Sequence, residues 1–145
     1  MEEIIRKIFQ QAKPLGSCKM FTGDERTVED IIKLFTDPQG IEFCIKKNFP
    51  DISTYRAFEP WFEEGRKHGI YIDAGAISLK NPKLALLIGN TAATITCDTV
   101  EDLHRVVALQ GAKCNVIACN WAVVRVRKDD NSTIIKSVHN NAIIL

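Results

Sequence analysis

The stretch that decides the fold is GAKCNVIACN WAVVRVRKDD NSTIIKSVHN NAIIL, residues 111–145, which divides into blocks of ten. Within each block, the second position is small, the fourth is apolar and the tenth is a turn former. The three series are Ala112, Ala122, Ser132 and Ala142; Cys114, Val124, Ile134 and Ile144; and Asn120, Asp130 and Asn140. Asn tolerates left-handed backbone conformations, so the tenth position suits a corner between strands.

Upstream, short apolar runs continue at similar spacing between turn formers. The candidate strands are Ala76–Leu79, Leu84–Ile88, Ala93–Cys97 and Arg105–Leu109. Strands recurring about every 8 to 12 residues are typical of a sandwich, a barrel or a solenoid. The repeated columns favour a solenoid, because its in-register coils stack like on like. We predict a β-solenoid of about eight strands in strand-turn-strand coils over 70–145, with an antiparallel β-sandwich or roll as the alternative.

The part before this region has a different composition. Residues 1–70 hold 23 of the 37 charged side chains and 9 of the 11 aromatic ones. Apolar residues at helical spacing predict a helix over Glu2–Ala12. Thr27 and Asp30 resemble a capping box, and Asp37-Pro38 resembles an N-cap followed by proline. The fold class is therefore α+β, with a helical module over 1–69 that caps the first coil of the solenoid.

Composition also limits the partners. The net charge of +1 argues against nucleic acid or an anionic membrane as the main partner. No apolar run approaches the roughly 20 residues that span a bilayer, and Met1-Glu2-Glu3 does not begin a secretory signal. The five cysteines, Cys18, Cys44, Cys97, Cys114 and Cys119, lack the spacing of a disulfide scaffold. We expect free thiols in a reducing cytoplasm.

The last apolar residues suggest a self-association surface. Ile143, Ile144 and Leu145 form an apolar, strand-like segment with no polar cap after it. Unpaired strand edges invite pairing. We expect this coil to pack against another copy of the chain or another protein, making a homo-oligomer the expected state. The alternative is that the last strand tucks back onto its own sheet.

Two groups of side chains could carry chemistry or bind a ligand. Cys97 and His104 flank the one insert in the repeat and could form a thiolate–imidazole pair, although Cys97 alternates with apolar neighbours and reads as a core thiol. Arg125 and Arg127 share a strand face and, with Trp121, could hold a phosphate or an acidic partner. The alternative is a solvated outer strand, because Asp129 and Asp130 follow directly and largely cancel the positive charge. No residues have zinc or nucleotide-motif spacing, so we expect no metal and no cofactor.

The chain is similar to a group of short bacterial or phage β-solenoid proteins of unassigned function, in which a helical part precedes the coils. The resemblance rests on the ladder at Ala112, Val124, Ile134 and Ala142, and on the stretches Ile70–Gly75, Leu87–Thr91 and Gly111–Lys113. It implies the fold and the origin, but no activity and no catalytic residues. Polymerising bactofilin-type solenoids are a looser analogy. The insert at 98–103 and the helices depart from their simple core, which argues against filaments.

These observations leave three functional hypotheses. The first is a non-catalytic interaction or self-assembly module. The second is a small ligand binder or Cys–His enzyme acting near the insert, through Cys97 and His104. The third is a glycan-binding module with Trp121 and Tyr71 as platforms, which would need export.

Overall fold

The computed structural model describes residues 2–16 and 24–145, and Cys18 lies outside them. The first half is helical. Its elements are α1 (Glu2–Ala12), η1 (Lys13–Leu15), α2 (Val28–Thr36), α3 (Pro38–Lys47), α4 (Ile52–Arg56), η2 (Glu59–Trp61) and α5 (Phe62–Lys67). The predicted capping box is confirmed, since the Thr27 hydroxyl accepts from the Asp30 amide and the Asp30 carboxylate accepts in return. Asp37 is confirmed as the N-cap of α3, with Pro38 in the first turn.

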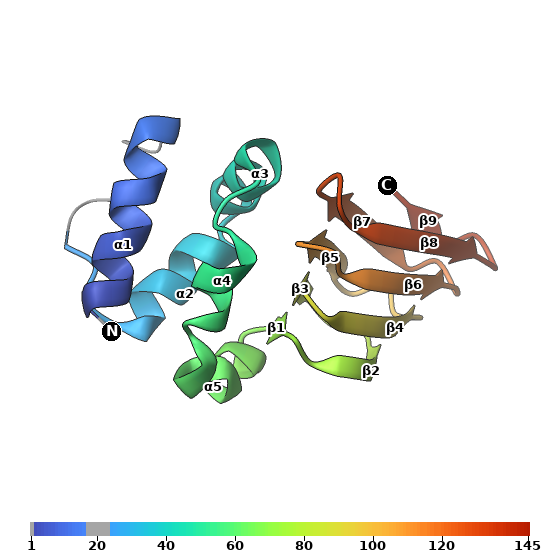
Figure 1. Ribbon diagram of the computed structural model, residues 1–145. Coiled ribbons are helices and arrows are strands. Elements are labelled where there is room, and N and C mark those ends of the chain that lie inside the picture. Colours follow the sequence, from blue (N-terminus) through green and yellow to red (C-terminus); the bar gives the residue numbers. More distant parts are fainter. Residues whose placement is uncertain (1, 17–23) are drawn as a thin grey trace.

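The second half is a two-sheet β-solenoid (Figure 1). Its strands are β1 (Ile70–Ile72), β2 (Gly75–Lys80), β3 (Leu84–Ile88), β4 (Thr91–Cys97), β5 (Leu103–Leu109), β6 (Lys113–Ala118), β7 (Val123–Lys128), β8 (Thr133–Val138) and β9 (Ile143–Ile144). Sheet A has the order β1-β3-β5-β7-β9 and sheet B the order β2-β4-β6-β8. Every pairing is parallel, which confirms the solenoid and excludes the antiparallel sandwich or roll.

The ten-residue repeat is half of a coil. Consecutive blocks lie in opposite sheets, so they face one another across the interior and do not stack. The residues that stack are twenty apart, such as Cys114 on Ile134 and Val124 on Ile144. The predicted in-register stacking of like residues is therefore confirmed, but at a spacing of twenty residues, twice the period of the blocks. Like residues repeat every ten positions because both sheets contribute the same kind of residue to a single core.

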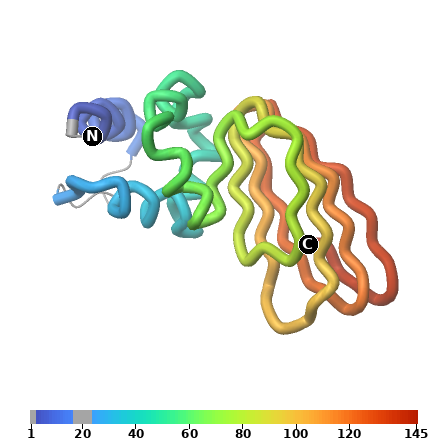
Figure 2. Tube along the Cα trace, turned by 90° about the horizontal axis from the view of Figure 1, so that it is seen from below, coloured from blue at the N-terminus to red at the C-terminus, as the bar shows by residue number. Residues whose placement is uncertain are grey.

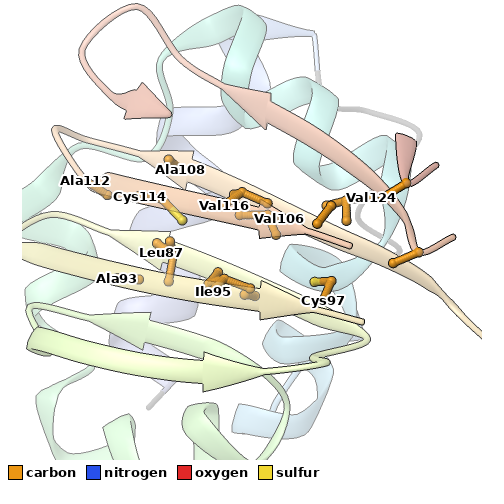
Figure 3. Packing of buried hydrophobic residues seen from close by; sticks show 14 residues of the cluster. Leu87, Ala93, Ile95, Cys97, Val106, Ala108, Ala112, Cys114, Val116 and Val124 are labelled. Atoms are coloured by element: carbon orange, nitrogen blue, oxygen red, sulfur yellow. The ribbon is translucent and has the colours of Figure 1, made fainter. Parts of the chain in front are cut away.

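That core is a narrow apolar column between the sheets (Figure 3). The larger side chains along it include Leu87, Ile95 and Val116, which are fully buried. Small residues, among them Ala112 and Ala122, are also fully buried, beside the corners where the chain changes sheet. The predicted insert is a loop between β4 and β5, but it covers 98–102, because Leu103 is already the first residue of β5 and pairs with Val123.

The helical module lies along the flank of the solenoid, and not across its first coil (Figures 1 and 2). Alternate residues of β1, β3 and β5 point outward from sheet A and are apolar, among them Ile72, Ile88 and Leu109. They share a buried cluster with Ile41 of α3 and Tyr55 of α4. Sheet A is therefore buried on both faces, which explains the continuous apolar run of β3.

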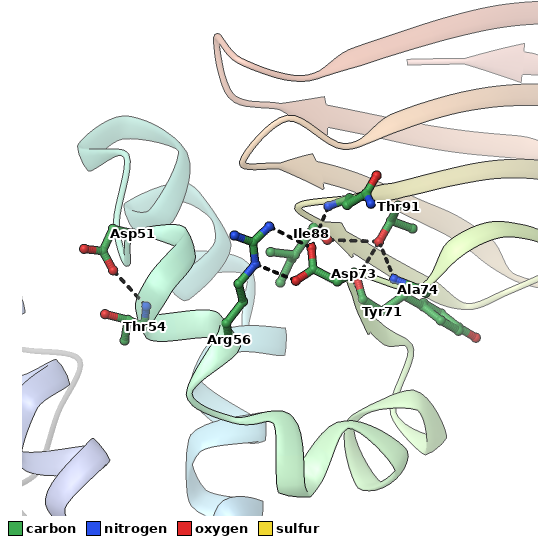
Figure 4. A network of polar contacts seen from close by, with 9 residues as sticks. Asp51, Thr54, Arg56, Tyr71, Asp73, Ala74, Ile88 and Thr91 are labelled. Atoms are coloured by element: carbon green, nitrogen blue, oxygen red, sulfur yellow. Dashed lines mark hydrogen bonds and ion pairs between the residues drawn. The ribbon is translucent and has the colours of Figure 1, made fainter.

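A polar contact fixes the module at the first coil (Figure 4). Nε and Nη2 of Arg56, on α4, donate to the two carboxylate oxygens of Asp73 at 2.6 and 3.3 Å. Asp73 adopts a left-handed conformation in the turn after β1 and also accepts from the backbone amide of Asn90 at 2.7 Å. The Arg56 guanidinium, followed by that amide, lowers the pKa of Asp73.

Removal of the Asp73 charge should make the module less stable at neutral pH. Because the pKa of Asp73 is lowered by folding, its contribution is complete above about pH 4 and is lost as pH falls through the lowered value. Asn tolerates the left-handed backbone, so Asp73→Asn removes the charge and one of the two acceptor oxygens without straining the turn. We expect a decrease in Tm of about 2 °C or less at pH 7, since both side chains are partly exposed, and a smaller decrease at about pH 3, below the pKa of the unfolded chain. Thermal unfolding followed by circular dichroism measures both.

The exposed Asp102, changed to Asn, is the matched control and should leave Tm unchanged at either pH. An equal decrease in Tm for Asp73→Asn at both pH values would show that the ion pair is not its cause.

Candidate functional site

The structure places Cys97 and His104 inside the solenoid. Both side chains are buried, with exposed fractions of 0% and 1%. Burial raises the pKa of the Cys97 thiol to about 11, so it is protonated at neutral pH. The His104 ring contacts backbone and hydroxyl oxygens: Nδ1 donates to the Pro82 carbonyl at 2.9 Å, and Nε2 lies 3.3 Å from the Thr99 hydroxyl. His104 thus fastens the insert to the coil, and the pair does not supply an activated thiolate.

Trp121 stands at the corner between β6 and β7 with an exposed fraction of 65%. Its φ of 68° lies in the left-handed region, beside Asn120 with φ of 54°. The equivalent position of the preceding corner is Gly111, with φ of 89°. A bulky side chain in this conformation is strained by contact between Cβ and the backbone, and its exposed ring gains little packing to compensate.

Trp121→Gly should therefore stabilise the protein. Relief of the left-handed strain is worth about 1 kcal/mol, which corresponds to an increase in Tm of about 2 to 4 °C. The matched control is Tyr71→Gly, at a β-strand position, which should lower Tm. Differential scanning calorimetry measures both. An unchanged or lower Tm for Trp121→Gly would contradict the strain argument and indicate that the ring packs usefully on the corner.

Arg125 and Arg127 lie in a groove between α3 and the outer face of sheet A. We call it the arginine groove. It has a volume of about 600 Å³, within the range of about 300 to 1,000 Å³ found for ligand pockets. It is lined by Pro38, Ile41, Glu42, Leu103, Arg105, Val107, Arg125 and Arg127.

The backbone register brings three guanidinium groups together. Arg105 on β5 is the direct neighbour of Arg125 on β7. Arg127 lies two residues further along β7, on the same face, beside Val107. Neighbouring strands are about 4.8 Å apart, so Arg105 and Arg125 are like charges side by side. Like charges directly opposite one another destabilise a sheet.

One carboxylate opposes these three cations. Oε2 of Glu42, on α3, accepts from Nη2 of Arg127 at 2.6 Å. The two side chains are 40% and 47% exposed, so the pair is accessible to solvent. Within residues 2–16 and 24–145, neither Arg105 nor Arg125 forms an ion pair. The groove therefore presents two unpaired guanidinium groups beside an apolar floor of Ile41 and Val107.

Arg105 and Glu42 were not among the site residues predicted from the sequence. Arg105 could have been found, because it precedes Arg125 by one coil of twenty residues, but the ten-residue period did not align them. Glu42 lies 85 positions from Arg127, and no local pattern connects the two.

The last coil, defined as β7, β8 and β9, carries the predicted interface residues. Ile143 and Leu145 are exposed, at 51% and 56%, whereas Ile144 faces inward above Val124. The last coil also contains two lysines at register positions that face inward in the preceding coil, Lys128 beside Ala108 and Lys136 beside Val116, and both are exposed at this end of the solenoid. Inward charges at a sheet edge oppose further pairing, so the end is less apolar than its final three residues indicate.

In the described part of the chain, no helix is long and apolar enough to cross a membrane. The same residues contain no group of three or more His, Cys, Asp and Glu side chains that could hold a metal ion. In comparisons with known proteins, no family model, no curated protein and no solved structure matches the chain.

Proposed function

We propose that this protein is a non-catalytic interaction module whose arginine groove binds an acidic segment of a partner protein. The observation that carries the proposal is the register of Arg105 against Arg125, with no described carboxylate pairing either one. Side-by-side cations cost stability in the free protein, and a bound anion would relieve that cost.

The chemistry of the groove suits carboxylates on a polypeptide. A guanidinium binds a carboxylate through two parallel N–H···O hydrogen bonds, which gives direction as well as energy. The exposed Pro38 and Leu103 at the rim can contact apolar side chains of the same segment, above the buried Ile41 and Val107. A ligand with both acidic and apolar groups fits this lining better than a small inorganic anion.

The lining also favours binding over catalysis. Its one carboxylate, Glu42, is held by Arg127, and the rest of the lining contains no Cys, His, Ser or Lys. General acid–base or nucleophilic chemistry needs such a group within reach of a substrate. A charged groove with no reactive side chain serves recognition.

A peptide of alternating Glu and Ser, labelled with fluorescein, tests this proposal by fluorescence anisotropy. We expect saturable binding that weakens as salt is raised, and no binding of the Gln-Ser peptide of equal length. Arg125→Glu should weaken the Glu-Ser peptide by about tenfold, through loss of one ion pair and addition of a repulsion. Lys113→Glu, on the outer face of sheet B, makes the same change in net charge and should bind normally.

Equal loss of peptide binding in Arg125→Glu and Lys113→Glu would show that binding depends on net charge, and would rule out the groove as the binding site. Tighter binding of a single-stranded oligonucleotide than of the peptide would overturn the protein-segment reading in favour of a nucleic-acid ligand.

Self-association through the last coil is a second candidate function. One observation favours it: of the described large apolar side chains that are exposed, four belong to this coil, namely Ile135, Val138, Ile143 and Leu145. We propose a second copy as the occupant, packed last coil to last coil about a two-fold axis. Helices α1 and α3 extend past β9 along the flank (Figure 1), so a continuous head-to-tail stack is obstructed.

For this dimer we expect light scattering after size exclusion to give a mass above 16.3 kDa. Ile143→Lys should return the mass to the monomer value. Val100→Lys, at an apolar residue of the insert that is more exposed than Ile143 (64% against 51%), should leave the mass unchanged. Added salt should strengthen association, because it screens Lys128 and Lys136 of the two copies from each other. A monomer at all salt concentrations would eliminate this interface.

A further inference from the structure

We infer that Glu42 is a resident competitor in the arginine groove: its carboxylate occupies Arg127 in the free protein and is displaced when an acidic segment binds. The inference rests on the proposed function of the groove and adds the regulation of that site. It follows from a comparison of the polar contacts that connect the helical module to the solenoid.

The first two contacts each involve several hydrogen bonds and are not easily replaced by a ligand. At the first coil, Asp73 uses both carboxylate oxygens on Arg56 and also accepts a backbone amide. At the third coil, the side-chain amide of Gln110 donates to the Pro50 carbonyl at 3.0 Å and to the Asn48 side chain at 3.2 Å. In each case one group satisfies several partners, and a replacement would have to satisfy all of them.

The third contact is of a different kind. Glu42 meets Arg127 through a single pair of atoms, Oε2 and Nη2, at 2.6 Å. A guanidinium has five N–H donors, so Arg127 keeps further donors that can receive an incoming carboxylate. Both side chains are more than a third exposed, so Glu42 can turn into water and be solvated when it leaves Arg127.

Displacement of Glu42 does not require α3 to move. Ile41 and Cys44, on the inward side of α3, are buried at 2% and 4% in the cluster that holds the helix on sheet A. The exchange therefore replaces one ion pair by another with little rearrangement of the backbone. A ligand gains on Arg127 only the difference between its own carboxylate and that of Glu42.

This arrangement selects for ligands with several acidic groups. A single carboxylate on Arg127 competes with Glu42 at nearly equal energy, so it gains little. A segment that also pairs with Arg105 and Arg125, which have no described competitor, gains from those contacts in full. Glu42 thus lowers the affinity of a carboxylate for Arg127, whereas a multiply acidic segment keeps the full gain from its contacts with Arg105 and Arg125.

The test is the affinity of Glu42→Gln for the fluorescein-labelled Glu-Ser peptide. Gln has the same shape as Glu without the charge, so it removes the competitor and keeps the lining. We expect binding about two- to fivefold tighter than that of the unchanged protein, the range of an exposed ion pair. Glu63→Gln is the matched control: Glu63 lies on α5 with its side chain 88% exposed, and the change should leave affinity unaltered. Acetate, as a single-carboxylate probe, should displace the peptide more readily from Glu42→Gln than from the unchanged protein.

Three outcomes would overturn the inference. Unchanged affinity in Glu42→Gln, with binding still weakened by Arg125→Glu, would show that the groove is the binding site but that Glu42 does not compete with the ligand. Weaker binding in Glu42→Gln would make Glu42 a residue that positions Arg127 for the ligand. No saturable binding by any of the proteins would defeat the proposed function, and the competitor with it.

Discussion

Burial of sheet A on both faces is the constraint on which the rest of the structure depends. Its inner face closes the solenoid core, and its outer face needs a second cover because β1, β3 and β5 present apolar residues outward. Helices α3 and α4 supply that cover. Further along the outer face of the sheet, arginines replace the apolar residues at equivalent register positions. Arg127 follows Val107, and Arg105 and Arg125 follow Leu84. The arginine groove lies at this change, where the apolar surface under the helices gives way to charge.

Local chemistry made the fold predictable, and long-range packing did not. The capping box at Thr27, the N-cap at Asp37 and the corner asparagines each act within a few residues, so their signals survive in the sequence. The length of a coil is different, because two facing sheets contribute the same residue types and halve the apparent period. The place of the helical module depends on which face of sheet A is apolar, and that becomes visible only when strands twenty residues apart are aligned.

The candidate site follows the same division. Arg125 and Arg127 could be placed on one strand face from their spacing alone. Arg105 needed the coil length, and Glu42 needed the docking of α3, which no pattern within β7 encodes. Cys97 and His104 were considered as a thiolate–imidazole pair because they flank the insert in the sequence. The interior of a coil explains both, since its walls are continuous backbone that buries the thiol and offers the imidazole carbonyl and hydroxyl oxygens.

The groove and the last coil share a border, which links the two proposed functions. The amide of Leu145 donates to the Val124 carbonyl, and the Leu145 carbonyl accepts from Val126, so Leu145 lies beside Arg125 at the edge of sheet A. Arg125, Lys128 and Lys136 place three positive charges without a described ion pair on or beside this coil, whereas Arg127 is already paired with Glu42 and Asp129 and Asp130 follow β7. An acidic segment in the groove would neutralise Arg125 and so lower the repulsion between two copies. The coupling is reciprocal: if the ligand favours dimer formation by a given free energy, dimer formation favours ligand binding by the same amount.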